Sequence, residues 1–301
     1  KGINLDTSLE LTPESVKGKF VYAKPNFNNT DNTLFTSLKS STNDFLSNSG
    51  YKTSELGFSL GTKFEQFQNI FLSPEIDFLI EDLETSNKAS NVLKKQEGSY
   101  TDLYFNYTIN QDLRDRKFQT QDGYQTFFSQ EVPLISDNSE FSNAFEVSKF
   151  KKLSTRSDTI GRISFFAKTI TGLNDDVRIS KRLNIPTNKL RGFEKGRVGP
   201  IDNNDYVGGN HVTTLNLSAT LPNILEDLDN LDIGVFFDAA NIWGVDYNSS
   251  LDDKSTIRTS TGIAFNLLTP IGPLSFSFAN ALTKASSDKT ETFRFRLGTQ
   301  F

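Results

Sequence analysis

The sequence predicts an all-β protein, with a transmembrane antiparallel β-barrel across residues 1–301. Three observations lead to this prediction. The last nine residues alternate strictly between apolar and polar side chains, and about fourteen alternating segments follow one another along the chain. No run of about eighteen apolar residues is present, which excludes a transmembrane helix.

The carboxy-terminal stretch is the clearest strand in the sequence. Its odd positions form one face, namely Phe293, Phe295, Leu297, Thr299 and Phe301. Its even positions form the other, namely Arg294, Arg296, Gly298 and Gln300. In a soluble sheet this would be an apolar edge strand, open to aggregation. In a membrane barrel the apolar face meets lipid and the arginines face a polar lumen. The nine residues alone fit either structure.

The composition fits a membrane barrel. Only 36% of the residues are hydrophobic, and the mean hydropathy is −0.43. Barrel strands of about ten residues need an apolar side chain only at every second position, so their hydropathy stays low. Aromatic residues make up 12% of the chain, more than the core of so polar a protein needs. We expect them to form aromatic girdles at the membrane surfaces.

Composition also excludes several functions. The chain has no cysteine, so it has no disulfide framework, cysteine-based zinc site or thiol nucleophile. A net charge of −5 argues against nucleic-acid binding. The chain begins at Lys1 and contains no methionine, which indicates a fragment or processed chain whose signal peptide and preceding domains have been removed.

Clusters of Asn, Asp, Ser, Gly and Pro separate the alternating segments. The predicted strands are Gly2–Glu10, Gly18–Lys24, Thr33–Ser41, Tyr51–Phe64, Ile70–Glu81, Tyr100–Gln111, Tyr124–Val132, Glu140–Leu153, Thr159–Leu173, His211–Leu221, Asp232–Trp243, Ile257–Thr269, Pro273–Leu282 and Thr290–Phe301. In the fifth, Ile76, Phe78 and Ile80 lie opposite Glu75, Asp77 and Glu81. An apolar row opposite a carboxylate row suits a wall between lipid and a wet lumen.

The connections differ in length. Tight turns are predicted at Thr269–Pro273, Gln121–Gly123 and Val132-Pro133, and longer loops at Asp82–Gly98 and Val245–Ser255, with a turn of helix expected within Ser86–Gly98. Residues 174–207 form the longest stretch without alternation, and loops of that length are usually functional or disordered. Outer-membrane barrels combine short periplasmic turns with long external loops, and a soluble sheet of so many strands would normally split or curl.

The long stretch carries the most distinctive motif, Lys189-Leu-Arg-Gly-Phe-Glu-Lys-Gly196. It offers an arginine that needs an acceptor, a glycine that permits an unusual backbone turn, and an aromatic side chain. By itself Arg-Gly-Phe is common by chance. Its position before Val207-Gly-Gly209 and a strand containing Phe236-Phe-Asp238 is much more specific.

With these motifs, and with Pro270-Ile-Gly-Pro-Leu274 and the terminal Phe293–Phe301, the chain resembles the carboxy-terminal barrels of the BamA family of outer-membrane β-barrel assembly factors. The resemblance spans nearly the whole chain. TamA-like factors and two-partner secretion transporters belong to the same superfamily. Barrels of this family have sixteen strands, which implies that the first two strands and the periplasmic POTRA domains are missing from this chain.

The resemblance also implies roles for particular residues. Arg191, Gly192 and Phe193 would belong to a loop, residues 174–207, folded into the lumen, with Arg191 paired to Asp238. The last strand would form the mobile side of a lateral seam, with the residues Phe293, Phe295, Leu297, Gly298 and Phe301. Gly298 would permit a kink.

Two departures from the family pattern predict a thinner network around Arg191. Ala240 stands where a glycine is usual, two residues after the aspartate. A small hydroxyl near Ser218 stands where a second lumen carboxylate is expected.

The other candidates favour structural interpretations. His211 is the only histidine, and we expect a wall or loop residue rather than a base or ligand. Glu226–Asp232 is rich in carboxylates but lacks the spacing of a calcium loop, so a solvated turn is expected. Lys94-Lys95 and the group near Lys149 are expected to be solvated, although lysines near an interface could meet anionic lipid.

Together with the sequence patterns, the resemblance implies a non-enzymatic, cofactor-free and metal-free protein of the Gram-negative outer membrane that inserts barrel proteins through a lateral gate. Expected partners are unfolded barrel clients, the accessory lipoproteins of the BAM complex, and outer-membrane lipid and lipopolysaccharide, but no nucleic acid. The alternatives are a TamA-like or two-partner secretion transporter, a diffusion porin, or an outer-membrane hydrolase that depends on His211.

Overall fold

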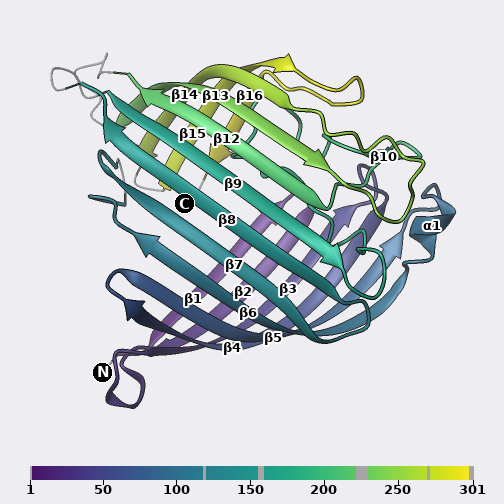
Figure 1. The fold of residues 1–301 in the computed structure, drawn as a ribbon, viewed down its shortest axis with the longest axis horizontal. Coiled ribbons are helices and arrows are strands. Elements are labelled where there is room, and N and C mark those ends of the chain that lie inside the picture. Colours follow the sequence, from purple (N-terminus) through teal and green to yellow (C-terminus); the bar gives the residue numbers. More distant parts are fainter. Residues whose placement is uncertain (1, 118–119, 155–158, 222–229, 270–271, 298–301) are drawn as a thin grey trace.

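The computed structural model describes residues 2–117, 120–154, 159–221, 230–269 and 272–297. Within these ranges, fourteen strands form one antiparallel sheet that curls into a barrel, with the first strands behind the middle ones in Figure 1. The strands are β1 (Asn4–Thr12), β2 (Ser15–Lys24), β3 (Thr33–Phe45), β4 (Tyr51–Phe67), β5 (Ile70–Thr85), β6 (Gly98–Asp112), β7 (Gly123–Ser136), β8 (Glu140–Lys152), β9 (Ile160–Gly172), β12 (His211–Thr220), β13 (Leu231–Trp243), β14 (Arg258–Thr269), β15 (Gly272–Thr283) and β16 (Phe293–Leu297).

Within this sheet, each strand pairs with its neighbours in chain order, except that β9 pairs with β12 across residues 173–210, which we call the long loop. The long loop contains a small hairpin of β10 (Ile201–Asp202) and β11 (Asp205–Tyr206). The predicted antiparallel barrel of about fourteen strands is confirmed. The predicted helical turn is also present, as α1 (Asn91–Lys94), where the hydroxyl of Ser90 accepts a hydrogen bond from the Leu93 N–H.

The outer face of the sheet is apolar and exposed. Cross-strand neighbours form a continuous row over four strands, namely Phe20, Leu38, Phe58 and Phe78. At the carboxy-terminal end, Phe278 and Phe295 are each 50% exposed and contact the neighbouring Phe276 or Phe293 rings. Soluble proteins rarely expose contiguous apolar rows of this size to water, so this face is the one that meets lipid.

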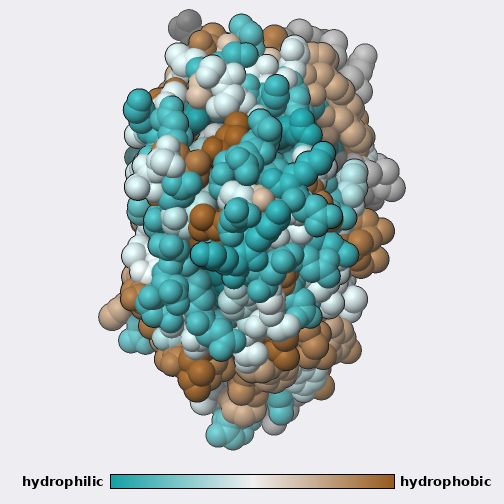
Figure 2. Space-filling model, turned by 90° about the vertical axis from the view of Figure 1, so that its right-hand side faces the viewer, coloured by the Kyte–Doolittle hydropathy of each residue, from teal (hydrophilic) through white to brown (hydrophobic). Residues whose placement is uncertain are grey.

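The inner face is polar and buried. Its residues include Ser37, Ser59, Asp77, Glu81, Asp102, Ser148, Ser164, Thr214, Asp238 and Ser260. In β5 the predicted division holds, because Ile76, Phe78 and Ile80 are exposed whereas Asp77 and Glu81 are buried. Hydrophilic residues also cover most of the barrel end that carries the long loop and α1, with hydrophobic residues gathered along its margins (Figure 2).

Two predicted tight turns are wrong. Pro133 lies inside β7, beside a bulge at which Leu103 pairs with Ile135 and Tyr104 pairs with Pro133. A bulge tolerates proline because the ladder is already interrupted there, so the missing N–H breaks no regular pair. Gly123 begins β7 at the end of a longer connection, residues 113–122, rather than forming a hairpin turn. No helix in the described ranges is long and apolar enough to cross a membrane.

We predict that Phe58→Arg, on the outer face, lowers the free energy of unfolding from lipid vesicles by roughly 2–4 kcal/mol, because the charge would lie in hydrocarbon. Ser8→Arg is the control, since Ser8 lines a lumen cavity of about 470 Å³ between β1, β2, β3 and β4. Urea titration in vesicles measures both variants. Equal losses would contradict the assignment of the two faces.

Candidate functional site

The long loop packs against the inner face of the barrel wall. Its apolar residues Leu190, Phe193 and Val198 are buried in one cluster with residues of three strands, namely Ile170, Val212, Ala240 and Ile242. Ile179 and Val207 join a second cluster near Leu93 of α1. Burial of these side chains contributes free energy that holds the loop to the wall.

The Leu190–Phe193 motif turns sharply at Gly192. Its φ of 86° lies in the left-handed region, which glycine adopts without steric cost. A Cβ at this position would also stand 3.2 Å from the Cβ of Ala279 and 3.3 Å from that of Ser260. The glycine therefore allows the loop backbone to approach the small residues of β14 and β15.

Arg191 and Asp238 form the ion pair at the centre of the motif. Nε and Nη2 of Arg191 donate to the two carboxylate oxygens of Asp238, each at 2.7 Å, and the Arg191 N–H donates to Oδ2 at 3.1 Å. The guanidinium lies 3.4 Å from the centre of the Phe236 ring. Asp238 is fully buried, so this bidentate pair has little competition from water.

Asn216 supplies an additional partner that the sequence reasoning missed. It lies opposite Asp238 in the β12–β13 ladder, and its Nδ2 donates to Asp238 Oδ1 at 2.9 Å and to the Lys189 carbonyl at 2.6 Å. Ser218 stands where the family pattern has a second carboxylate. The preceding residue on the same face of β12, Asn216, supplies an amide there. Ala240, at the other departure, is buried beside Phe193 in the apolar cluster.

A second arginine of the long loop, Arg178, also escaped the sequence reasoning. Its side chain is 1% exposed and lies among three buried carboxylates from three strands. Nε donates to Glu140 Oε1 at 3.0 Å, Nη2 donates to Asp102 Oδ2 at 2.6 Å, and Nη1 lies 3.2 Å from Glu81 Oε2 without hydrogen-bond geometry. The Tyr100 ring is 4.3 Å from the guanidinium carbon.

The charge of Arg178 is strongly favoured by this setting. Burial alone would lower its pKa, but hydrogen bonds and charge from Glu140, a hydrogen bond to Asp102 and the charge of Glu81 outweigh burial and raise the pKa. Arg182, one turn further along the loop, differs. Burial lowers its pKa despite the nearby charge of Asp246, to which its Nη2 donates.

The residues that the sequence analysis assigned to a seam lie at the end of the sheet. Phe293 and Phe295 face outward, and the backbone of Leu297 pairs with Leu274 of β15. Gly298 and Phe301 lie outside the described residues.

The other candidates from the sequence are His211 and the acidic stretch near Glu226. His211 stands opposite Trp243 in the ladder, with the two rings 5.4 Å apart. Residues 222–229, most of the acidic stretch near Glu226, lie outside the described ranges. Where the structure is described, no group of three or more His, Cys, Asp or Glu residues could hold a metal ion.

We predict that Arg191→Ala and Asp238→Ala each lower the free energy of unfolding by roughly 3–5 kcal/mol, because each leaves a buried charge without its partner. The double variant should cost less than the sum of the two. Lys195→Ala, in the half-exposed pair with Glu14, is the control and should cost less than about 1 kcal/mol. Urea unfolding, followed by fluorescence of the single Trp243, measures all four variants. Additive effects would contradict direct coupling of Arg191 and Asp238.

We also predict that Arg178→Met lowers the free energy of unfolding by roughly 3–5 kcal/mol, since three buried carboxylates lose their counter-charge. Arg178→Lys should be intermediate, because an ammonium group cannot reproduce the forked bonds of a guanidinium. Lys88→Met on the exposed loop near α1 is the control, and the same fluorescence titration serves. A Met variant as stable as the parent would show that the contacts of Arg178 with the three carboxylates contribute nothing to stability.

Comparison with known proteins gives consistent similarities. The family model of the Omp85 superfamily domain matches residues 1–301. The outer membrane protein assembly factor BamA of Neisseria meningitidis serogroup B (strain ATCC BAA-335 / MC58) is 31% identical over 37% of this chain and 17% of its own length. BamA of Neorickettsia risticii (strain Illinois) is 23% identical over 65% of this chain and 27% of its own length. The chain therefore spans less than a third of these relatives.

Solved structures share the fold. BamA from Haemophilus ducreyi lacking POTRA domains 1–3 matches with a TM-score of 0.85 at 20% identity, over 98% of this chain and 64% of that one. CdiB from Acinetobacter baumannii matches with a TM-score of 0.54 at 11% identity, over 97% and 58%. The family match over the whole chain and the barrel it folds into establish that this chain belongs to the Omp85 superfamily, as a BamA-like barrel of the Gram-negative outer membrane.

Proposed function

We propose that this barrel folds other β-barrel proteins and inserts them into the outer membrane through a seam between its end strands. The two curated relatives are named outer membrane protein assembly factors, which supports this function. The barrel acts as a template and needs no covalent chemistry. Its partners are unfolded barrel clients, accessory lipoproteins, and outer-membrane lipid with lipopolysaccharide.

The late start of the last strand is the observation that carries the proposal. β16 begins at Phe293, opposite Phe278, whereas β15 continues to Thr283, so the end of β15 from Asn280 onward has no partner in β16. An edge with few main-chain partners can accept an incoming strand by β-augmentation, because the free N–H and C=O groups are already aligned. The outward Phe293 and Phe295 keep that edge within the lipid layer.

The anchored long loop supports the same function. We infer that it lies within the lumen and braces the wall from inside. Arg178 contacts β5, β6 and β8, whereas Arg191 contacts β13, so the two anchors hold strands on both sides of the loop. A braced wall can lose pairing at its seam without collapse of the remaining strands.

The rival functions make different demands. A two-partner secretion transporter or a diffusion porin needs an open path through the lumen, which the packed long loop would obstruct. Single-channel conductance in planar bilayers separates these functions, since the proposed function requires no large steady current. A hydrolase would require His211 as a base, and loss of hydrolysis on its substitution would support that alternative.

We predict that full-length protein in proteoliposomes accelerates the folding of a urea-unfolded barrel client several-fold over protein-free liposomes. The reason is that a templated strand avoids unpaired backbone groups in hydrocarbon. The shift in gel mobility of the folded client, with and without heating, measures the rate. Asp238→Ala should slow the reaction, whereas Asp252→Ala on an exposed loop is the control. Client folding no faster than in empty liposomes would refute the function.

A further inference from the structure

The connection between β15 and β16 is bonded to the long loop through its main chain. The Glu194 N–H donates to the Lys289 carbonyl at 3.0 Å, and the Lys289 N–H donates to the Arg197 carbonyl at 3.0 Å. The Glu291 N–H donates to the carbonyl of Gly192 at 3.2 Å. The loop thus forms a short ladder with the segment that leads into the last strand.

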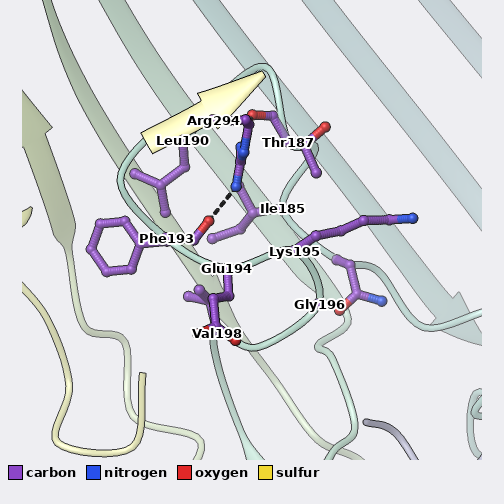
Figure 3. Close-up of a pocket in the computed structure, with 10 residues that line it drawn as sticks. Ile185, Thr187, Leu190, Phe193, Glu194, Lys195, Gly196, Val198 and Arg294 are labelled. Carbon is purple, nitrogen blue, oxygen red and sulfur yellow. Dashed lines mark hydrogen bonds between the residues drawn. The ribbon is translucent and has the colours of Figure 1, made fainter. Parts of the chain in front are cut away.

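Arg294 extends this attachment into β16 itself. Its position, opposite Ser277 in the ladder, points its side chain inward, and only 12% of that side chain is exposed. Nη1 donates to the carbonyl of Thr187 at 2.6 Å, and Nη2 donates to the carbonyl of Phe193. Figure 3 shows Arg294 reaching from the strand to Phe193 across the turn of the loop.

Glu291 fixes the orientation of the guanidinium, because its carboxylate accepts from Nε of Arg294. All three nitrogens of the fork are therefore engaged. The space beside the group, between Ile185, Leu190 and Val198, amounts to a cavity of about 10 Å³, which has room for roughly one water molecule at most. A buried charge held this tightly favours one position of the strand relative to the loop.

One carbonyl acceptor, that of Thr187, precedes the Leu190–Phe193 motif and the other, that of Phe193, ends it, while Arg191 within the motif pairs with Asp238. The loop backbone therefore joins two arginine contacts, one to the fixed wall at β13 and one to the seam strand β16. Movement of β16 away from the barrel must break the Arg294 contacts as well as its pairing with β15.

We propose that Arg294 is the positioning residue that couples the long loop to the seam strand, so that release of β16 and loosening of the loop around residues 187–194 occur together. Only the purpose of the coupling rests on the proposed function. That purpose is to hold the seam closed until a client strand competes for β16. The coupling itself is a property of this chain.

Hydrogen–deuterium exchange on the full-length protein in proteoliposomes tests the coupling. In Arg294→Ala, amides of residues 187–194 and 291–297 should exchange about tenfold faster or more, because charge-assisted bonds are lost at both ends. Amides around Arg178 should be unchanged. Arg294→Lys should show a smaller increase, since one ammonium group cannot reach both carbonyls. Glu291→Gln should change the same peptides in the same direction.

Lys289→Ala is the matched control, because this exposed side chain lies in the same connection and only its backbone is bonded to the loop. Faster exchange in β16 alone, with residues 187–194 unchanged, would overturn the coupling. Retained gel mobility shifts on heating confirm that each variant is folded. If Arg294→Ala is not folded, the Lys and Gln variants decide the question by the same comparison.

Client folding by the same proteins separates the two proposals. If the parent protein accelerates client folding but exchange in residues 187–194 does not respond to Arg294, the coupling is wrong and the proposed function stands. If the two segments respond together but the parent protein does not accelerate client folding, the coupling stands and the proposed function is wrong.

Discussion

Pairing of buried charges between the long loop and the inner face of the barrel wall is the interaction on which the rest of the structure depends. A barrel wall that presents lipid with apolar side chains must turn its polar ones inward, and several of those are carboxylates with little access to water. Arg178 and Arg191 of the long loop form ion pairs with Glu81, Asp102, Glu140 and Asp238. Without Arg178, the carboxylates of Glu81, Asp102 and Glu140 would lie close together at high electrostatic cost.

The same constraint explains the shape of the loop contacts. Two arginines of the long loop contact the wall at its carboxylates. The backbone at Gly192 contacts it at the small residues Ser260 of β14 and Ala279 of β15. Polar pairing thus sets where the loop attaches, and small side chains set how closely it approaches. The last strand takes part through Arg294, so β16 and the long loop share one hydrogen-bonded structure.

Alternation was sufficient to predict the strands, because a two-sided wall leaves a period of two in the sequence. Arg191 and Asp238 could be matched through family resemblance. The contacts of Asn216 and of Arg178 could not be predicted, because strand register decides which residues they meet. The turns that fix register carry little sequence signal. Pro133 misled the prediction because proline marks both turns and bulges.

The anchors of the long loop come from strands far apart in the sequence. Arg178 pairs with Glu81, which lies nearly a hundred residues earlier in the chain. Arg191 pairs with Asp238, which lies well after it. Neither half of the chain can seat the loop alone, and such long-range contacts form slowly because chain entropy must be lost first. The docked position of the loop is therefore available only once strands from both halves of the wall are in place.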